Sequence, residues 1–325
     1  MAGLEVLLSI RGRNSDIVLS WATIGPASTL IGGCPLKVNL VYDVKSFVLE
    51  NGNVLDKLRI AAAGYEIPEE TTRELIAIVR AIMNEDGGVP FDVKPGSPSS
   101  AKTTAEILKL LVQLGLDVGN LVDRMVRFLV SRQKNDGGFA ETMNLNSYIE
   151  DKFGATEGRE WYPVGKSITW LTGKALEALC LAKYENEERL RRARDFLLYN
   201  QYEDGHWPDY VGHAESDPLG TGNILPALRA VGVSEDNEVY VNGRAALFQH
   251  LKHSIESGFT FDMVDLAAVV PPKTDLEREI VVQGIELIVR TQRSDGGWCV
   301  VGSKKSNPDL SAQLALVVKR CAETV

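Results

Sequence analysis

The chain contains 325 residues, of which 44% are hydrophobic and 24% are charged, the proportions of an ordinary globular protein. Its formal net charge of −9 provides no basic stripe to meet phosphates, so we exclude nucleic acid as a partner. No apolar segment is long enough to span a bilayer, the N-terminus lacks the basic flank of a signal peptide, and the four cysteines show no CxxC spacing. These features predict a cytoplasmic protein with reduced thiols, and they leave peripheral contact with a membrane open.

The first 40 residues form a segment for which the sequence predicts no helix. They are rich in Val, Ile, Ser and Gly and fit no helical period. We expect an irregular or β segment over residues 1–40 and a single domain over residues 41–325.

The rest of the chain repeats a helix that ends at an Asp-Gly turn. The helix-spaced apolar runs that end in this way cover residues 74–83, 121–133, 189–201 and 281–292. Glycine supplies the left-handed conformation that ends a helix. Three of the four turns, "QKNDGGF", "QYEDGHW" and "QRSDGGW", carry a Gln three residues before the Asp and an aromatic residue after the turn. Because Gln can donate and accept hydrogen bonds, we expect it to bridge one helix end to the backbone of the next repeat, with the aromatic ring filling the space above the turn.

A second helix, which opens with small and hydroxyl residues, follows each turn. These runs cover residues 101–115, 168–182, 217–232 and 307–320 and carry fewer charges than the first helices, as expected of helices packed on more sides. Weaker copies of the pair have their turns at Gly258 and at Gly32-Gly33. The sequence therefore predicts an all-α fold of six helix pairs closed into an (α/α)6 toroid.

The three Gln-containing turns, each followed by a helix that opens with Thr or Ser, resemble the QW repeats of squalene–hopene and oxidosqualene cyclases. The β subunits of protein prenyltransferases share the same helix-pair toroid. The resemblance covers about residues 60–325, and the chain is similar in length to one barrel of the two-barrel triterpene cyclases. It implies a terpenoid-cyclase-like enzyme, of isomerase or lyase type, that cyclises or rearranges a hydrophobic isoprenoid polyene in an apolar central cavity after protonation by an acid.

In the family that the chain resembles, the initiating acid is the middle Asp of an Asp-x-Asp-Asp-Thr-Ala motif. A buried carboxyl can stay protonated because burial disfavours its charged form, and it can then protonate an alkene. The segment "DMVDLA" keeps the outer two acids as Asp262 and Asp265, with Val264 in the middle, and "DPLGTG" keeps the first as Asp217. No segment carries the complete motif, so Asp262, Asp265 and Asp217 are all candidate acids. We interpret Asp309 as a helix cap.

Two loops that lead into second helices, residues 153–170 and 204–221, are rich in aromatic and ionisable side chains. In a toroid, such loops surround one mouth of the central cavity, where aromatic faces can stabilise a carbocation. The candidate substrate-binding residues are Trp161, Tyr162, Trp170, His206, Trp207, Asp209, Tyr210, His213 and Phe261.

No segment carries the residues that a metal or a cofactor needs. The Asp-rich cluster that holds Mg²⁺ is absent, and Cys180 and Cys299 lack the neighbouring Asp and His of a prenyltransferase zinc site. We therefore expect no metal and no cofactor. Two alternatives stay open: a non-catalytic toroid that binds a lipid or a protein partner, and another cyclase that uses the same cavity. An oligomer or a second-barrel partner is also left open.

Overall fold

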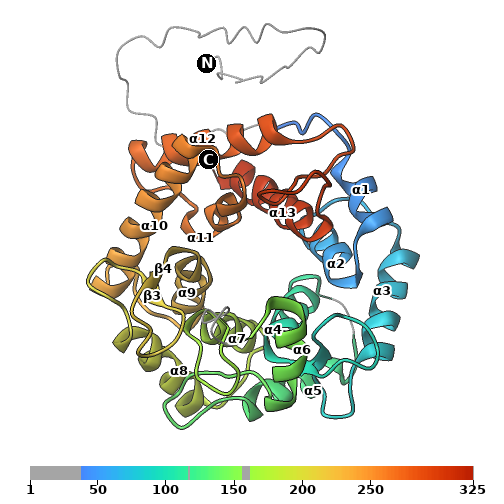
Figure 1. The fold of residues 1–325 in the computed structure, drawn as a ribbon, viewed down its shortest axis with the longest axis vertical. Helices are drawn as coiled ribbons and strands as arrows, with labels where there is room; N and C mark the ends of the chain where they lie inside the picture. The colour runs from blue at the N-terminus through green and yellow to red at the C-terminus, as the bar shows by residue number, and fades with distance from the viewer. Residues whose placement is uncertain (1–37, 116–117, 156–161, 325) are drawn as a thin grey trace, which may run out of the picture.

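The computed structural model of the chain describes residues 38–115, 118–155 and 162–324. Over these residues the helices form an inner and an outer ring (Figure 1). The inner ring consists of α2 (Val54–Ala62), α4 (Ala101–Gln113), α7 (Thr169–Leu181), α9 (Pro218–Ala230), the 3₁₀ turn η3 (Phe261–Asp265) with α11 (Leu266–Val269), and α13 (Pro308–Thr324). The outer ring consists of α1 (Val44–Asn51), α3 (Glu69–Ile82), α5 (Leu121–Ser131), α8 (Glu187–Tyr199), α10 (Glu238–Ser257) and α12 (Asp275–Thr291).

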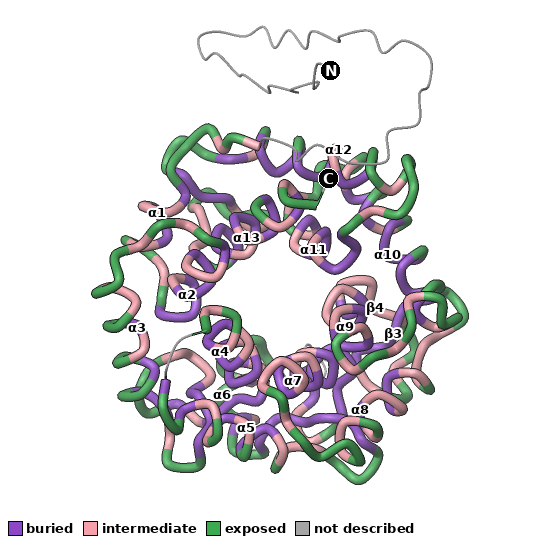
Figure 2. The backbone as a smooth tube through the Cα atoms, turned by 180° about the vertical axis from the view of Figure 1, so that it is seen from behind, coloured by how far each residue is buried: buried purple, intermediate pink, exposed green. Residues whose placement is uncertain are grey.

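The ring closes because each inner segment packs against the next. Helix α2 contacts α4, α4 contacts α7, α7 contacts α9, α9 contacts α11, α11 contacts α13, and α13 returns to α2. Helix α7 is buried over most of its length, as expected of a helix with neighbours on every side (Figure 2). Over the described residues the arrangement is an α/α toroid, and the predicted all-α fold is confirmed.

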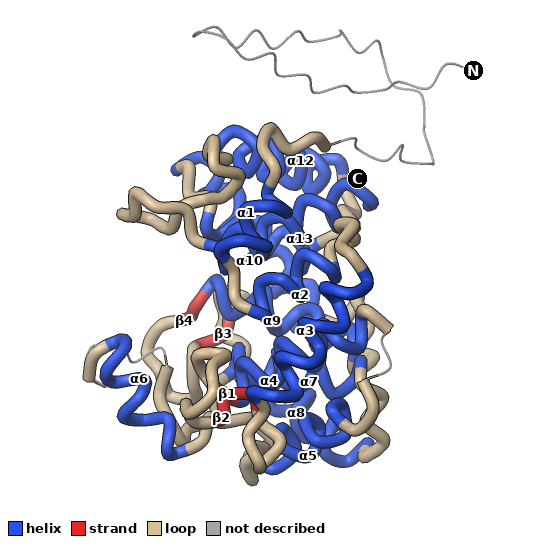
Figure 3. Tube along the Cα trace, turned by 90° about the vertical axis from the view of Figure 1, so that its right-hand side faces the viewer, coloured by secondary structure: helices blue, strands red, loops and turns tan. Residues whose placement is uncertain are grey.

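The loops that enter the inner helices gather on one face of the ring. Figure 3 shows α6 (Asn146–Phe153) and two short antiparallel pairs on that face, β1 (Val89–Pro90) with β2 (Ser99–Ser100) and β3 (Trp207–Pro208) with β4 (Ser216–Asp217). A 3₁₀ turn, η1 (Met143–Leu145), precedes α6. Among the described helices, none has the length and apolar character to cross a membrane.

The glutamines before the Asp-Gly turns link successive repeats, as the sequence predicts. The side chain of Gln133 donates to the carbonyl of Gly137 in its own turn, at 3.1 Å, and to that of Arg189 in the next outer helix, at 2.9 Å. The glutamine of the middle turn makes the equivalent pair of bonds at 2.9 and 2.8 Å. Gln292 donates to the carbonyl of Tyr42 and accepts from its N–H, both at 3.0 Å. This last turn therefore joins the two ends of the described chain and closes the ring.

The aromatic residue after each turn is fixed between an inner and an outer helix. The N–H of Trp298 donates to the Ser311 hydroxyl at 2.9 Å, and its indole N–H donates to the Ile288 carbonyl at 2.8 Å. In the same way, the N–H of Phe139 donates to the Thr172 hydroxyl at 2.8 Å. At these two turns the Thr or Ser near the start of the second helix is thus the acceptor for the turn.

The Asp-Gly turns need glycine for both conformation and space. Gly137 has a φ of 96°, in the left-handed region, and a Cβ atom on it would collide with the carbonyl oxygen of Arg192. The Asp136 carboxylate accepts from the N–H of Gly138 at 3.0 Å and from the Ser167 hydroxyl at 2.8 Å.

The first helix pair is α1 with α2, and its connection differs from the other turns. Gly52 joins the two helices in an extended conformation, with a φ of −83°, and α2 begins with a capping box formed by Asn53 and Asp56. The turn predicted at Gly32-Gly33 and the irregular or β segment predicted for residues 1–40, up to residue 37, lie outside the described residues.

Candidate active site

A central cavity of about 640 Å³ is enclosed by the inner ring, and every inner segment contributes to its wall. Its volume falls within the roughly 300–1,000 Å³ usual for small-molecule sites. The loop between β3 and α9 also reaches the wall, from the face on which the inner helices begin.

The wall of the cavity has an apolar side and a charged side. The apolar side comes mainly from α9, η3, α11 and α13 and includes Leu219, Gly220, Gly222, Pro226, Phe261, Val264, Ala267, Ala268, Leu316 and Val317. The charged side comes mainly from α2, α4, α7 and α13 and includes Arg59, Lys102, Glu106, Lys109, Lys174, Glu177, Asp309 and Arg320. The predicted apolar cavity therefore also has a charged side that the sequence analysis did not predict.

The charged side is held together by buried ion pairs centred on Arg59. Its guanidinium lies 3.0 Å from Glu106 Oε2 and also pairs with Asp309. Lys174 Nζ of α7 lies 2.8 Å from the second carboxylate oxygen of Glu106. Burial raises the pKa of Glu106, but the charges of Lys174, Lys102 and Arg59 outweigh burial and hold that pKa far below its usual range. The carboxylate of Glu106 is therefore ionised and fixed.

A second ion pair, between Lys109 and Glu177, links the neighbouring helices α4 and α7 at 2.6 Å. Burial lowers the pKa of Lys109, although the charge of Glu177 opposes this change. Charges that are paired in this way cost less to bury than isolated ones. The two clusters together give the cavity a polar but largely neutralised side.

Asp265 is a carboxyl group on the apolar side of the cavity. Its side chain is only 7% exposed, and its buried Oδ2 has no hydrogen-bond partner in the part of the chain that the structure describes. Gly222 makes room for it, because a Cβ atom there would collide with the carboxyl. Burial raises the pKa of Asp265 well above its usual value, the charge of Lys174 opposes this, and the charges of Asp217 and Asp262 reinforce it. Burial therefore favours the protonated form of this carboxyl.

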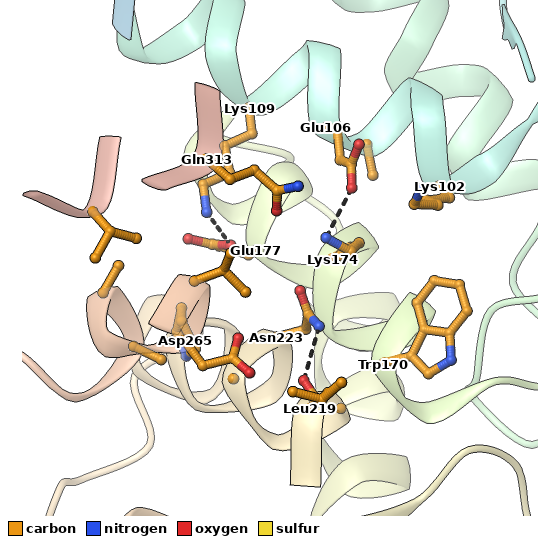
Figure 4. Close-up of a pocket in the computed structure, with 18 of the residues that line it drawn as sticks. Lys102, Glu106, Lys109, Trp170, Lys174, Glu177, Leu219, Asn223, Asp265 and Gln313 are labelled. Carbon is orange, nitrogen blue, oxygen red and sulfur yellow. Dashed lines mark hydrogen bonds and ion pairs between the residues drawn. The ribbon is translucent and has the colours of Figure 1, made fainter. Parts of the chain in front are cut away.

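Figure 4 shows the side chains of Asp265, Lys174 and Glu106 directed into the same cavity from three inner segments. The lysine therefore lies between an ionised carboxylate, with which it is paired, and a protonated carboxyl on the other side of the space.

A pair of carboxyl groups lies where the loop from β3 meets the start of α9. Asp217 is the N-cap of α9 and accepts two backbone N–H groups of the first turn, both at 3.0 Å. Asp209 is 6% exposed. Burial, the charge of Asp217 and a hydrogen bond with Asp217 raise the pKa of Asp209 to about 7, against smaller lowering effects of His213 and Trp170. Burial also raises the pKa of Asp217. The two groups therefore share one proton near neutral pH.

Part of the chain is similar to known protein families. Residues 100–218 match the squalene-hopene cyclase C-terminal domain family. A segment of 83 residues is 37% identical to lanosterol synthase of Saccharomyces cerevisiae, and it makes up 25% of this chain and 10% of that protein. Both matches cover only part of this chain, and both support the terpenoid cyclase superfamily.

Solved structures of terpene cyclases have the same fold. The type II terpene cyclase MstE from Scytonema, in complex with its product merosterolic acid A, aligns over 87% of this chain and 96% of its own, with a TM-score of 0.65 and 16% identity. The ent-copalyl diphosphate synthase from Streptomyces platensis aligns over 88% of this chain and 51% of its own, with a TM-score of 0.55 and 18% identity. These identities are too low to carry more than the fold.

Among the three candidate acids, Asp265 and Asp217 line the cavity of this terpenoid cyclase fold, and Asp262 does not. Asp262 accepts from the Ser254 hydroxyl at 2.6 Å and lies 3.2 Å from His250 Nε2, so it ties η3 to α10. Burial raises its pKa, but the nearby His250 ring and the hydrogen bond from Ser254 outweigh burial and lower that pKa. An ionised carboxylate outside the wall has no proton to give to a ligand in the cavity.

The cavity wall includes four of the nine candidate substrate-binding residues: Trp170, Asp209, His213 and Phe261. Trp161 lies outside the described residues. The other four lie behind the wall.

Trp207 is fully buried and donates its indole N–H to the Leu197 carbonyl at 2.7 Å, the same contact that the last turn makes. His206 Nδ1 lies 2.9 Å from a threonine hydroxyl of α9. The hydroxyl of Tyr162 donates to a buried glutamate at 2.7 Å, and the Tyr210 ring lies 5.1 Å from that of His213. These four side chains fix the loops from which the wall is built.

Sequence reasoning missed the charged side of the cavity. A signal for it exists in the two inner helices α4 and α7, where Lys102, Glu106 and Lys109 recur at helical spacing and Lys174 precedes Glu177 by three residues. Charges that recur along one face of an otherwise apolar helix indicate a polar surface inside the ring.

Proposed function

We propose that this chain is an acid-initiated terpenoid cyclase that protonates an alkene of an isoprenoid substrate and so starts its cyclisation or rearrangement. The observation that carries the proposal is Asp265, a buried carboxyl with a raised pKa and an oxygen without a partner, on the apolar side of the central cavity. A carboxylic acid kept neutral by its apolar surroundings is suited to give its proton to a group as weakly basic as an alkene.

The proposed reaction is a net isomerisation. The proton of Asp265 moves to one alkene carbon, whose new C–H bond takes up the π electrons, and the neighbouring carbon becomes a cation. A second alkene of the chain attacks that cation and closes a C–C bond. Loss of a proton from a carbon next to the final cation restores an alkene, so no metal, cofactor or co-reactant enters the balance.

The charged side of the cavity supports the first step. Proton transfer turns Asp265 into a carboxylate, and the positive charge of Lys174 already favours that form. The ion pair with Glu106 at 2.8 Å holds the lysine in place, so this stabilisation needs no rearrangement of the wall. Trp170 and Phe261 also line the cavity, and an aromatic ring can stabilise a carbocation.

A wall with one apolar and one polar side suits an amphipathic substrate. The MstE structure that holds geranylgeranyl dihydroxybenzoate as its substrate aligns over 87% of this chain, with a TM-score of 0.63. By analogy, we propose an isoprenoid chain that carries a polar group, with the chain on the apolar side and the polar group toward the charges.

The test is an incubation of purified protein with farnesyl diphosphate, geranylgeranyl diphosphate, squalene and geranylgeranyl dihydroxybenzoate, followed by mass spectrometry of the extract. We expect one of them to give a product with the mass of the substrate, and we expect Asp265→Asn to abolish it. The control is Asp236→Asn, which changes an exposed carboxyl outside the cavity and should leave product formation within about threefold of the wild type. Product formation by Asp265→Asn at the wild-type rate would refute the assignment of the acid.

The charged side of the cavity favours one alternative, a non-catalytic toroid that binds an amphipathic lipid. Eight ionisable side chains on that side are more than a carbocation reaction needs. If folded protein binds the four compounds but converts none of them, this alternative replaces the cyclase.

A further inference from the structure

The acidic side chains of the cavity differ in how they are paired. Glu106 and Glu177 on the charged side have cationic partners within 3.0 Å. Asp209, Asp217 and Asp265, from the loop after β3, from α9 and from η3, have no ion-pair partner among the described residues. We call these three residues the acidic arc.

The negative charges of Asp209 and Asp217, the two outer members of the acidic arc, repel each other. Asp209 is hydrogen-bonded to Asp217, which is itself fixed as the N-cap of α9. Two carboxylates in contact repel each other, and a shared proton removes that repulsion. A positively charged group from a ligand would remove it equally well, and it would add an ion pair that the protein itself does not supply.

The third member lies deeper in the cavity. Asp265 packs against Gly222, which follows Asp217 by five residues on α9 and so lies about 7.5 Å further along the helix. Its Oδ2 is buried, has no partner in the described part of the chain, and belongs to a side chain directed into the cavity (Figure 4). A ligand that enters past Asp217 therefore meets a second acidic group.

An aromatic face lies next to the carboxyl pair. Trp170 lines the cavity beside Asp209 and is 6% exposed. An ammonium group beside Asp209 would contact this indole as well, and a cation gains free energy over an aromatic face. Beyond it, the apolar side from Leu219 to Pro226 is long enough for a hydrocarbon chain.

We infer that the cavity binds an organic amine on an apolar chain, with the ammonium group held by Asp209 and Asp217 and the chain on the apolar side. This site goes beyond the proposed reaction, which assigns no charge to the substrate. A measurement of binding alone tests this inference, whether or not the bound molecule is converted.

Binding of an ammonium group displaces the proton that Asp209 and Asp217 share. The affinity for the amine should therefore rise with pH up to about 7, the pKa of Asp209, and change little above it. The groups that face the pair are His213 in the same loop, His206 and His250 behind Asp217, and Lys174 across the cavity. Positive charge on the histidines at low pH also lowers the affinity for an ammonium group. The direct measure of proton displacement from the carboxyl pair is therefore the release of a proton on binding.

The test uses decylamine, decanol and decanoate, which share a chain and differ in charge. Isothermal titration calorimetry at pH 7, in two buffers with different ionisation enthalpies, gives the affinity and the number of protons released. We expect decylamine to bind about tenfold more tightly than the other two, as a charge-assisted hydrogen bond worth about 1.5 kcal/mol implies, and to release a proton.

Asp209→Asn and Asp217→Asn should each remove the preference for the amine and the proton release. Both are isosteric, and asparagine is a good N-cap, so α9 should keep its start. Asp236→Asn, which removes an exposed carboxylate elsewhere, should keep the preference. Equal affinities for the three compounds, tighter binding of decanoate, or a preference that survives in Asp209→Asn would each overturn the inference.

Discussion

The interaction between Asp209 and Asp217 leads to a prediction about the stability of the protein without a ligand. The pKa of Asp209 is about 7 in the folded protein, against 3.8 for an unperturbed aspartate. Between these two values the folded state binds a proton that the unfolded state releases, so the free energy of unfolding falls as the pH rises from about 4 to about 7. At about 1.36 kcal/mol per pH unit, the full difference corresponds to about 4 kcal/mol, and we halve it to about 2 kcal/mol because the cavity admits water.

Replacement of Asp209 by Asn removes this fall in the free energy of unfolding, because the amide never ionises. We expect the variant and the wild type to be about equally stable near pH 4, and the variant to be about 2 kcal/mol more stable near pH 8. Urea unfolding followed by circular dichroism at a series of pH values measures the difference. Asp236→Asn, which changes an exposed aspartate, should show no such trend. A difference between Asp209→Asn and the wild type that stays constant with pH, or that favours the wild type near pH 8, would refute the argument.

Two further predictions concern the ring itself. Gln292→Ala removes three hydrogen bonds, two of which join the last turn to Tyr42, and should lower the free energy of unfolding by about 2–4 kcal/mol in urea melts. A loss below about 0.5 kcal/mol would show that these bonds do not hold the ring closed. Gly137→Ala combines a left-handed φ with a collision against the next outer helix and should cost about 3 kcal/mol or more. Gly64→Ala, at a φ of 78° but with nothing within 4 Å, should cost about 1 kcal/mol, and equal costs at the two positions would contradict the role of the close approach.

The fold could be predicted from the sequence because each repeat carries its own contacts. Gln133, Gly137 and Thr172 make the bonds of one turn with local partners or with the next repeat, and the same residue types recur in the other copies. The first helix pair, α1 with α2, has no Gln and no Asp-Gly turn at its connection, Gly52. The sequence pattern therefore predicted the turn at Gly32-Gly33 instead.

The site was less accessible to sequence reasoning. Asp265 could be found because its spacing from Asp262 matches two positions of a known motif. Asp262 and Asp265 differ in burial and in their hydrogen-bond partners, which the spacing does not reveal. The contact between Asp209 and Asp217 depends on the pairing of β3 with β4, and the charged side depends on which helix faces point toward the ring axis. The cytoplasmic location, the division at residue 40 and any oligomer or second barrel stay predictions.

The central claim is that Asp265 gives a proton to an alkene, and isotope incorporation tests it most directly. In D₂O the carboxyl proton of Asp265 exchanges for deuterium. The product formed there should therefore carry one deuterium more than the product formed in H₂O, at the carbon that is protonated first. Asp265→Asn should give no deuterated product. Cyclised product without deuterium, or deuterated product from Asp265→Asn, would contradict the account.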